Sequence, residues 1–305
     1  MADLEIQFLG TGSAVPTKER GLSCVVIYFE NELLFFDSGE GAQRAAIVAG
    51  VGLNKDCSIF ITHMHGDHSV GLLGLIQTMA LNRRQKPLRI FGPKGVSDFV
   101  ISNQRILGFG LTFDVRLKTT RQGVVYDSDK PGFRVLASRS KHSRISYAYV
   151  FEEKPRPGRF DVKKAISLGI PEGPLWGKLQ RGESVRSERN RMVRPSQVLG
   201  KPRPGKKIGI SGDTRPSDSL AKFFKGCDVV IFDSTYSDEH SSLAKENMHS
   251  TSREAAWVAK KAGAKVLFLT HFSARYRSVS QLVRQAREVF PNTFAASDQM
   301  LYKVK

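Results

Sequence analysis

A block of three histidines and one aspartate is the feature that most constrains this chain. Residues 63–68 read His-Met-His-Gly-Asp-His, directly after a short apolar run that predicts a buried strand. At a strand-to-helix turn alternate side chains can point into one pocket, with His63 and His65 spaced for one metal ion and Asp67 and His68 for a second. Imidazole and carboxylate donors favour Zn²⁺ over Mg²⁺ or Ca²⁺. The block therefore predicts a metal centre rather than a surface histidine cluster.

Other residues of metal-binding type stand beyond short apolar runs elsewhere in the chain. Asp37, Asp213, Asp233 and His271 each stand at or just past the end of such a run, and His142 comes a few residues after another. These runs predict buried strands, and sheet proteins commonly build sites at strand ends. A metal pair about 3.5–4 Å apart can share a bridging carboxylate and hydrolyse phosphodiesters. His142, His271 and Asp213 are therefore candidate ligands beside the block.

Helical periodicity separates several of these runs. Apolar and small residues over 70–81, 252–262 and 280–289 predict helices, and for the second we expect a cap at Ser252 and a stop at Gly263. Strands that alternate with helices predict an α/β architecture.

Composition favours a globular protein with a polyanionic partner and argues against a membrane protein. The 305 residues include 47 Lys and Arg against 29 Asp and Glu, a formal net charge of +18, which favours nucleic acid as the partner. No apolar run is long enough for a membrane span, and the start of the chain shows no secretory signal. Cys24, Cys57 and Cys227 are far apart, which predicts buried reduced thiols and a cytoplasmic location.

Residues 152–207 differ in composition from the rest of the chain. They hold 15 Lys and Arg against 6 Asp and Glu, so half of the excess positive charge, together with 7 of the 13 prolines. Such a stretch fills a core poorly and predicts either a protruding basic arm or a solvated disordered loop. The patch Gly-Pro-Leu-Trp-Gly-Lys-Leu at 173–179 favours local structure, because Trp and Leu side chains need something to pack on.

These motifs resemble the metallo-β-lactamase superfamily and, within it, the short form of tRNase Z, a tRNA 3′-processing endoribonuclease. The superfamily hallmark is the block that begins at Thr62. The segments that narrow the match follow the family's order: 8–17, 37–41, 91–95, 173–179, 212–216, 249–251 and 270–276. The resemblance implies an αβ/βα sandwich of two stacked sheets with helices outside, spanning 1–305, with the basic arm of 152–207 inserted in it.

The resemblance also implies an activity and its cofactors. The chain would be a zinc-dependent endoribonuclease that removes the 3′ trailer of precursor tRNA, by attack of metal-bound hydroxide on the phosphodiester that leaves a 3′-hydroxyl. Two Zn²⁺ per chain, with Mn²⁺ or Mg²⁺ as substitutes, would be held by seven ligands: His63, His65 and His142 for one ion, Asp67, His68 and His271 for the other, and Asp213 as the bridge.

Two catalytic roles beyond metal binding follow from the same resemblance. Asp67 matches the family's general base, and His249 matches the histidine that protonates the leaving 3′-oxygen. The carboxylate partner of that histidine lies in a family motif His-Glu-Ala-Thr, where this chain reads Phe-Asp-Ser-Thr at 232–235. Asp233 falls on the glutamate position and is one methylene shorter, while Phe232 replaces the histidine.

The implied partners are precursor tRNA and a second copy of the chain. The basic arm resembles an exosite that clamps the tRNA elbow, and family members are homodimers in which one subunit's arm serves the other's active site. We expect no membrane partner. The candidate RNA contacts are Thr17, Arg20, Gly173, Pro174, Lys178 and Arg181.

Two other functions stay open from the sequence. A small phosphodiesterase or a thioesterase of the same superfamily would share the histidine block but would not need the basic arm. An RNA-binding module with a vestigial site would bind RNA without turnover and would be indifferent to chelation. Deleting the arm tests the first alternative, and removing the metal tests the second.

Overall fold

The structure, a computed structural model, describes residues 4–129 and 132–305, which form two compact units. The first unit runs up to Glu152 and resumes at Lys207, and the second is the segment Glu153–Lys206. Within the described residues no helix combines the length and the apolar character needed to cross a bilayer.

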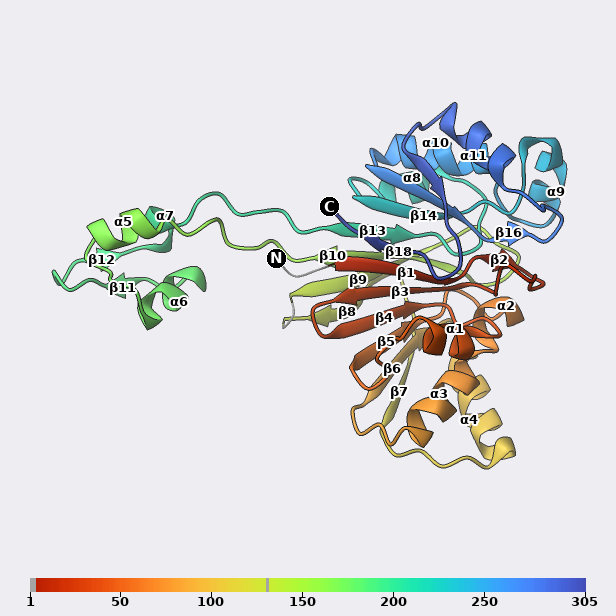
Figure 1. The fold of residues 1–305 in the computed structure, drawn as a ribbon, viewed down its shortest axis with the longest axis horizontal. Helices are drawn as coiled ribbons and strands as arrows, with labels where there is room; N and C mark the ends of the chain where they lie inside the picture. The colour runs from red at the N-terminus through yellow and green to blue at the C-terminus, as the bar shows by residue number, and fades with distance from the viewer. Residues whose placement is uncertain (1–3, 130–131) are drawn as a thin grey trace. The chain divides into compact units, whose positions relative to one another are not determined.

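The first sheet of the larger unit joins the N-terminal half of the chain to its last strand (Figure 1). Its strands β4 to β7 are parallel, whereas β1 pairs antiparallel with both β3 and β18. In order across the sheet the strands are β18 (Leu301–Lys303), β1 (Leu4–Gly10), β3 (Cys24–Phe29), β4 (Glu32–Phe36), β5 (Asp56–Phe60), β6 (Leu88–Gly92) and β7 (Val115–Thr119).

The second sheet repeats this division into a parallel and an antiparallel part. Strands β13, β14, β15 and β17 are parallel, and β10 pairs antiparallel with β13. In order the strands are β17 (Thr293–Ala295), β15 (Val266–Thr270), β14 (Val229–Asp233), β13 (Lys207–Ile210), β10 (Tyr147–Glu153), β9 (Phe133–Arg139) and β8 (Gly123–Ser128). A short parallel pair, β2 (Gly12–Ser13) and β16 (Phe272–Ser273), lies outside both sheets.

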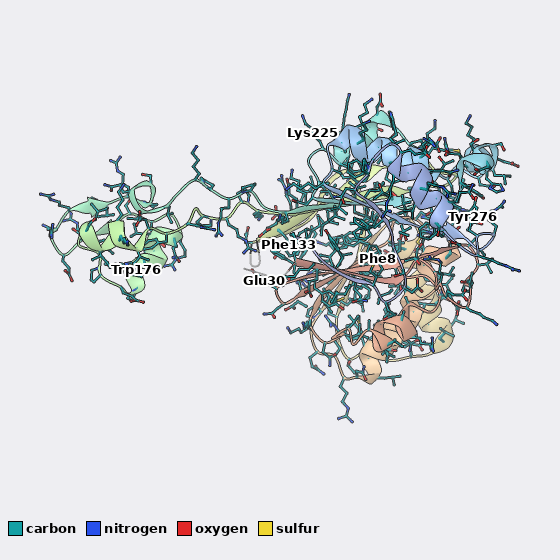
Figure 2. All side chains as sticks on the ribbon, turned by 45° about the horizontal axis from the view of Figure 1, so that its top comes forward. Phe8, Glu30, Phe133, Trp176, Lys225 and Tyr276 are labelled. Carbon is teal, nitrogen blue, oxygen red and sulfur yellow. The ribbon has the colours of Figure 1, made fainter. Side chains whose placement is uncertain are left out.

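Helices cover the outer faces of the two sheets, and aromatic side chains fill the space between them. The first sheet packs against α1 (Ala42–Val48), α3 (Leu72–Leu81) and α4 (Val96–Leu107), and the second against α8 (Asp218–Phe223), α10 (Ser252–Ala262) and α11 (Ser280–Arg287). The inner core contains Phe8, Phe29, Phe60 and Phe133, of which Figure 2 labels Phe8 and Phe133. This four-layer arrangement is the predicted αβ/βα sandwich.

Local sequence signals explain where the helices begin and end. Helix α10 ends at Gly263, which adopts the left-handed conformation as expected. The prediction that Ser252 caps this helix is wrong. Thr251 is the cap, because its side chain accepts from the Glu254 N–H while the Glu254 carboxylate accepts from the Thr251 N–H. The helix predicted over 70–81 is α3, which begins two residues later than expected, and a separate short helix, α2 (Gly66–Ser69), contains the last three residues of the histidine block.

The smaller unit has an apolar core of its own. Its elements are α5 (Val162–Ser167), α6 (Pro174–Gln180), β11 (Val185–Arg186), β12 (Met192–Val193) and α7 (Pro195–Val198). The Trp-containing patch forms α6, where Leu179 is fully buried and the Trp176 indole donates to the Ile170 carbonyl at 3.1 Å. Residues 153–206 therefore fold as an ordered unit despite their charge.

All three cysteines are buried free thiols, as the sequence predicted. Burial raises the pKa of Cys57 and of Cys227 to about 12, and it also raises the pKa of Cys24. These thiols therefore serve as small apolar core residues.

Candidate metal centre

The first group of donors gathers three imidazoles and one carboxylate from three distant stretches of the larger unit. His63 Nε2 lies 3.0 Å from His65 Nδ1, and His142 Nε2 lies 3.3 Å from the same His65 nitrogen. Asp213 Oδ2 is 3.5 Å from His63 Nε2. The donor atoms of this group all lie within 4.8 Å of one another, so one cation can contact all four.

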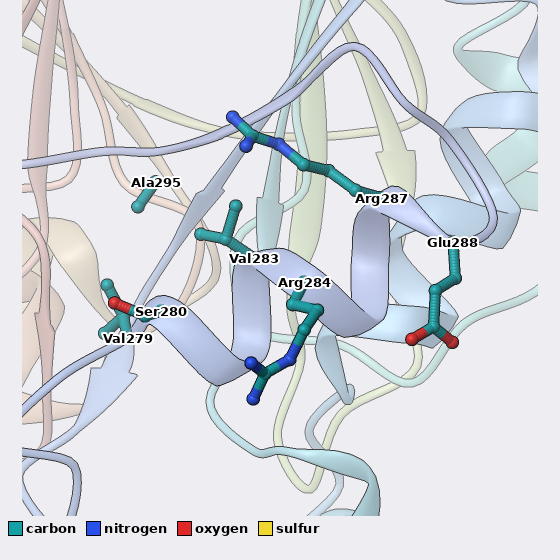
Figure 3. A pocket seen from close by; sticks show the side chains of 7 residues that line it. All are labelled: Val279, Ser280, Val283, Arg284, Arg287, Glu288 and Ala295. Carbon is teal, nitrogen blue, oxygen red and sulfur yellow. The ribbon is translucent and has the colours of Figure 1, made fainter.

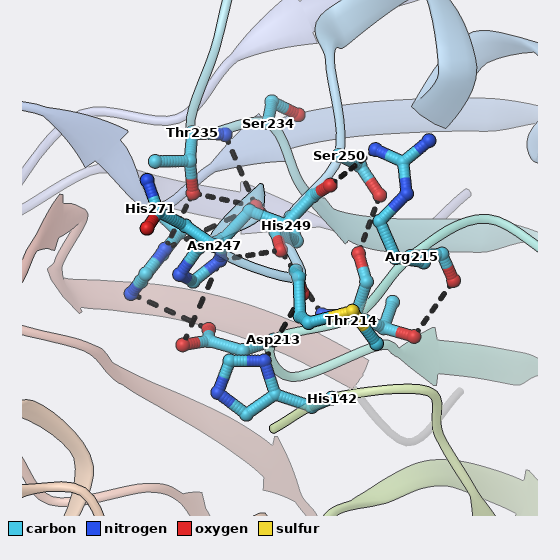
Figure 4. Close-up of polar contacts among 12 residues, drawn as sticks. His142, Asp213, Thr214, Arg215, Ser234, Thr235, Asn247, His249, Ser250 and His271 are labelled. Atoms are coloured by element: carbon cyan, nitrogen blue, oxygen red, sulfur yellow. Dashed lines mark hydrogen bonds and ion pairs between the residues drawn. The ribbon is translucent and has the colours of Figure 1, made fainter. Parts of the chain in front are cut away.

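The second group uses the other two residues of the histidine block. His68 Nε2 lies 3.2 Å from His271 Nε2, and Asp67 Oδ2 lies 3.3 Å from that His271 nitrogen. Asp213 also belongs to this group, with Oδ2 3.2 Å from His68 Nε2 and Oδ1 3.3 Å from His271 Nε2. Figure 4 shows Asp213 between His142 and His271. The carboxylate thus stands between both groups, at the position predicted for a bridge.

The sheet topology explains why residues so far apart in sequence meet here. His63 follows β5, Asp213 follows β13 and His271 follows β15, and each of these strands belongs to the parallel part of its sheet. The carboxyl ends of parallel strands open on one edge, where α/β proteins build their sites. Gly212 permits the contact between the two sheets, since a Cβ there would stand 2.8 Å from the Thr62 Cβ.

Hydrogen bonds from residues behind the candidate ligands orient the imidazoles. Asp37, at the end of β4, accepts from the Thr62 N–H at 2.7 Å and lies 2.7 Å from His68 Nδ1. Thr235 Oγ1 lies 2.8 Å from His271 Nδ1, and the Met248 carbonyl accepts from His142 Nδ1 at 3.0 Å. Such contacts fix which ring nitrogen faces a metal. The sequence did not assign these roles. Only Asp37 could have been suspected of one, because it stands directly after a buried strand, where sites are commonly built.

Backbone strain concentrates at the same place. Among the described residues eight non-glycine residues have positive φ, and four of them contact the centre: Ala14, Asp37, Met248 and His271. The Ala14 N–H donates to Asp67 Oδ2 at 2.8 Å. Left-handed conformations at non-glycine residues cost about 1–3 kcal/mol each and persist where the surroundings impose them, often at functional sites.

A histidine–aspartate pair lies beside the two donor groups. His249 Nδ1 is 2.9 Å from Asp233 Oδ2 and 3.9 Å from Asp213 Oδ2. Asp233 is fully buried and accepts in addition from the Thr214 N–H, the Thr235 N–H and the Thr235 hydroxyl. Burial opposes the charged imidazolium, but the Asp233 carboxylate outweighs it and raises the pKa of His249 to about 9. The pair can hold a proton in a buried site.

The donor set fits a divalent cation. Burial lowers the pKa of His63 to about 2, so its imidazole is neutral and keeps a lone pair to donate. Burial opposes the charge of Asp213, yet the surrounding imidazoles hold the pKa of this carboxyl well below its ordinary range. Asp213 Oδ1 is buried and receives no hydrogen bond, although His271 Nε2 lies 3.3 Å away. A buried, unpartnered carboxylate oxygen among facing ring nitrogens is what a bound divalent metal would satisfy.

The predicted RNA contacts of the larger unit differ in how they are held. Thr17 is exposed in the loop before β3. Arg20 is engaged within the fold, because its guanidinium donates to Thr11 Oγ1 and to the Ala296 carbonyl and stacks 4.6 Å from the Phe272 ring centroid. The guanidinium therefore anchors this loop. In the smaller unit the predicted contacts are all exposed: Gly173, Pro174, Lys178 and Arg181.

A separate hollow of about 640 Å³ lies on α11 and β17 (Figure 3). Val279, Val283 and Ala295 line it together with Arg284, Arg287 and Glu288. None of the predicted site residues lines this hollow, so it is distinct from the candidate centre.

Comparisons with known proteins establish the family to which the chain belongs. Two family models match parts of the chain, one described as anti-Pycsar protein Apyc1 over residues 4–104 and one as beta-lactamase superfamily domain over residues 179–272. The chain is 46% identical to the ribonuclease Z of Nitrosopumilus maritimus over 302 residues, which cover 99% of this chain and 100% of that protein. The chain belongs to the ribonuclease Z family.

Other ribonuclease Z relatives support the same assignment. The ribonuclease Z of Methanothermobacter thermautotrophicus is 44% identical, with 99% of this chain and 97% of that protein covered. The crystal structure of the human tRNase Z short form superposes with a TM-score of 0.71 at 28% identity, covering 99% of each chain. The predicted metallo-β-lactamase fold and the predicted hydrolase of the ribonuclease Z type are therefore confirmed.

Proposed function

We propose that this ribonuclease Z family member is a zinc-dependent endoribonuclease that removes the 3′ trailer from precursor tRNA and leaves a 3′-hydroxyl. The observation that carries the proposal is the meeting of two donor groups at Asp213, with the His249–Asp233 pair beside them. Five imidazoles with carboxylates are the donor set that Zn²⁺ prefers, and two groups accommodate two ions. Mn²⁺ or Mg²⁺ would serve as substitutes.

The chain's own residues supply orientation and proton transfer. Bound divalent cations would stabilise the charge that develops on the phosphate and lower the pKa of the attacking water. Asp67 is the general base, and the Ala14 N–H donates to its Oδ2 and holds the carboxylate in place. Because His249 binds Asp233 through Nδ1, its Nε2 is the atom left to protonate the departing ribose 3′-oxygen.

The segment Glu153–Lys206 is proposed as a basic arm that grips tRNA. It carries 14 Lys and Arg against 5 Asp and Glu, and Lys178 and Arg181 are exposed on or next to α6. Phosphate contacts position a nucleic acid without reading its sequence, which suits recognition of tRNA by shape. Binding should therefore weaken steeply with ionic strength.

A homodimer and a cytoplasmic location complete the proposal. Apolar side chains on the helices that cover the first sheet remain exposed: Ile47 on α1, Leu81 on α3 and Ile106 on α4. Exposed apolar side chains of this size favour association with a second copy. Three free thiols and an RNA substrate suit a reducing compartment.

Mapping the cut site on a 3′-extended precursor tRNA tests the function. We expect one cut next to the discriminator base in the presence of Zn²⁺ or Mn²⁺, and we would compare precursors with and without an encoded CCA. A protein with its metals bound that leaves every precursor intact contradicts the proposal.

A deletion tests the alternative of a small phosphodiesterase or thioesterase. Glu152 and Lys207 are paired neighbours on β10 and β13, so an Asn-Gly turn can replace residues 153–206 and close the hairpin. We expect the shortened protein to lose tRNA cleavage while it still hydrolyses bis(p-nitrophenyl) phosphate. Unchanged tRNA cleavage would contradict the role of the basic arm and favour the alternative.

A further inference from the structure

An arginine–glutamate pair holds the backbone of the residue proposed as the general acid. Arg215 Nη1 donates to the His249 carbonyl at 2.5 Å and to Glu254 Oε2 at 2.9 Å, while Nη2 contacts Glu254 Oε1. The Arg215 side chain is only 12% exposed and that of Glu254 is 28% exposed. Figure 4 shows Arg215 close to Ser250, on the backbone side of His249. The guanidinium therefore makes a forked, charge-assisted contact that leaves little freedom.

The residues on either side of His249 are fixed as well. The Met248 carbonyl accepts from His142 Nδ1, and the Ser250 hydroxyl donates to the Thr214 carbonyl at 2.6 Å. Met248 itself has a φ of 59°, in the left-handed region. The turn that carries His249 is therefore strained and depends on outside contacts to keep its shape.

Glu254 links this turn to helix α10. Its Oε2 accepts from the Thr251 N–H at 2.9 Å as part of the capping box, and the same oxygen receives Arg215 Nη1. One carboxylate thus fixes both the start of the helix and the arginine that reaches the His249 carbonyl. The imidazole side of His249 is held separately, by Asp233.

We propose that Arg215 and Glu254 are positioning residues that aim His249 at the leaving oxygen. This inference rests on the proposed function, since it assigns the pair to the proton-donating half of that reaction. Neither residue touches the donor atoms of the metal groups, so their effect acts through the His249 backbone. A small displacement of an acid costs up to about 10²-fold in rate.

A comparison of two leaving groups tests this role. The ribose 3′-oxygen needs a proton as it departs, whereas p-nitrophenolate is stable without one. For R215M and E254Q we expect kcat on precursor tRNA to fall by about 10–100-fold. On bis(p-nitrophenyl) phosphate we expect less than about a threefold change, because general acid catalysis contributes little there. R215K, which keeps the charge but not the fork, should lie between R215M and the unaltered protein.

Matched controls separate positioning from folding. Arg253 lies next to Glu254 on α10 and pairs with two carboxylates, Asp238 and Glu288, but it does not reach His249. R253K should therefore leave the cleavage rates of both substrates unchanged. Equal losses on both substrates, or a loss of bound metal in the Arg215 variants, would overturn the positioning role alone. Failure of the unaltered protein to cut precursor tRNA would overturn the proposed function and this inference with it.

Discussion

Asp233 reaches His249 although its side chain is one methylene shorter than the glutamate that the family motif places there. The 2.9 Å contact between Asp233 Oδ2 and His249 Nδ1 is made from the end of β14, in a pocket where Asp233 has no exposed surface on its side chain. Three donors from Thr214 and Thr235 hold the carboxylate in one orientation. These hydrogen bonds hold the shorter side chain where its carboxylate still contacts His249.

Replacing Asp233 by asparagine should disable the proton relay. The amide keeps the shape but removes the charge that favours the protonated imidazole, so we expect kcat on precursor tRNA to fall by about 10²-fold or more. Single-turnover cleavage assays measure this loss. The exposed carboxylate Asp218, which pairs with Lys261, provides the control D218N. A D233N protein as active as D218N would show that the relay does not use this residue.

Asp67→Ala should abolish turnover and largely spare tRNA binding. This substitution removes both the general base and one donor of the second group, while the basic arm proposed to grip tRNA is untouched. Cleavage assays and filter binding measure the two effects separately. D114N alters an exposed aspartate that pairs with Arg116 and should match the unaltered protein. An active D67A protein would refute the assignment of Asp67.

Chelation should remove activity and lower the melting temperature. His68 Nε2 and His271 Nε2 face each other at 3.2 Å. Without a cation between them, these two nitrogens have no shared ligand that stabilises their approach. Bound metal adds its binding free energy to the stability of the folded state. We expect elemental analysis to give two metal ions per active chain, and Zn²⁺ or Mn²⁺ to restore cleavage. Fewer than two ions in fully active protein would contradict the two-group arrangement.

Glu152 should make stability depend on pH. Burial opposes its charge, but the hydrogen bonds from Lys207 and Arg134, each at 2.5 Å, lower the pKa of the carboxyl. A lowered pKa contributes stability above the ordinary value near pH 4.3, and this contribution is lost as the pH falls through the folded-state value. At pH 7 we expect E152Q to be less stable by up to about 1 kcal/mol, because the partners are partly exposed. In urea unfolding the difference should disappear at acidic pH, and a constant difference would contradict the ion-pair origin.

The three thiols should resist modification in the folded protein. Cys24, Cys57 and Cys227 are buried, and burial raises their pKa values, so the reactive thiolate is scarce and inaccessible. A disulfide reagent such as dithionitrobenzoate should titrate no thiol before unfolding and three after it. Rapid labelling of the native protein would show that the core opens.

Much of this protein follows from local sequence. The short apolar runs predicted strands β4, β5, β13, β14 and β15, because strands buried on both faces of a sheet are mostly apolar. Gly263 ends α10 because only a residue without a Cβ adopts that conformation freely. The spacing of His63, His65 and His68 predicted the candidate metal centre, because crowded histidines gain nothing without a shared ligand.

Tertiary structure alone decided the contacts between residues distant in sequence. Asp37, Thr235 and the Met248 carbonyl orient the imidazoles, and Arg215 reaches the His249 carbonyl, yet no spacing in the chain indicates these contacts. Even the cap of α10 was assigned to Ser252 instead of Thr251, one residue away. Local patterns record which residues are buried and which elements form. The partner of a buried polar atom depends on how two sheets and their helices pack, which no single stretch of sequence contains.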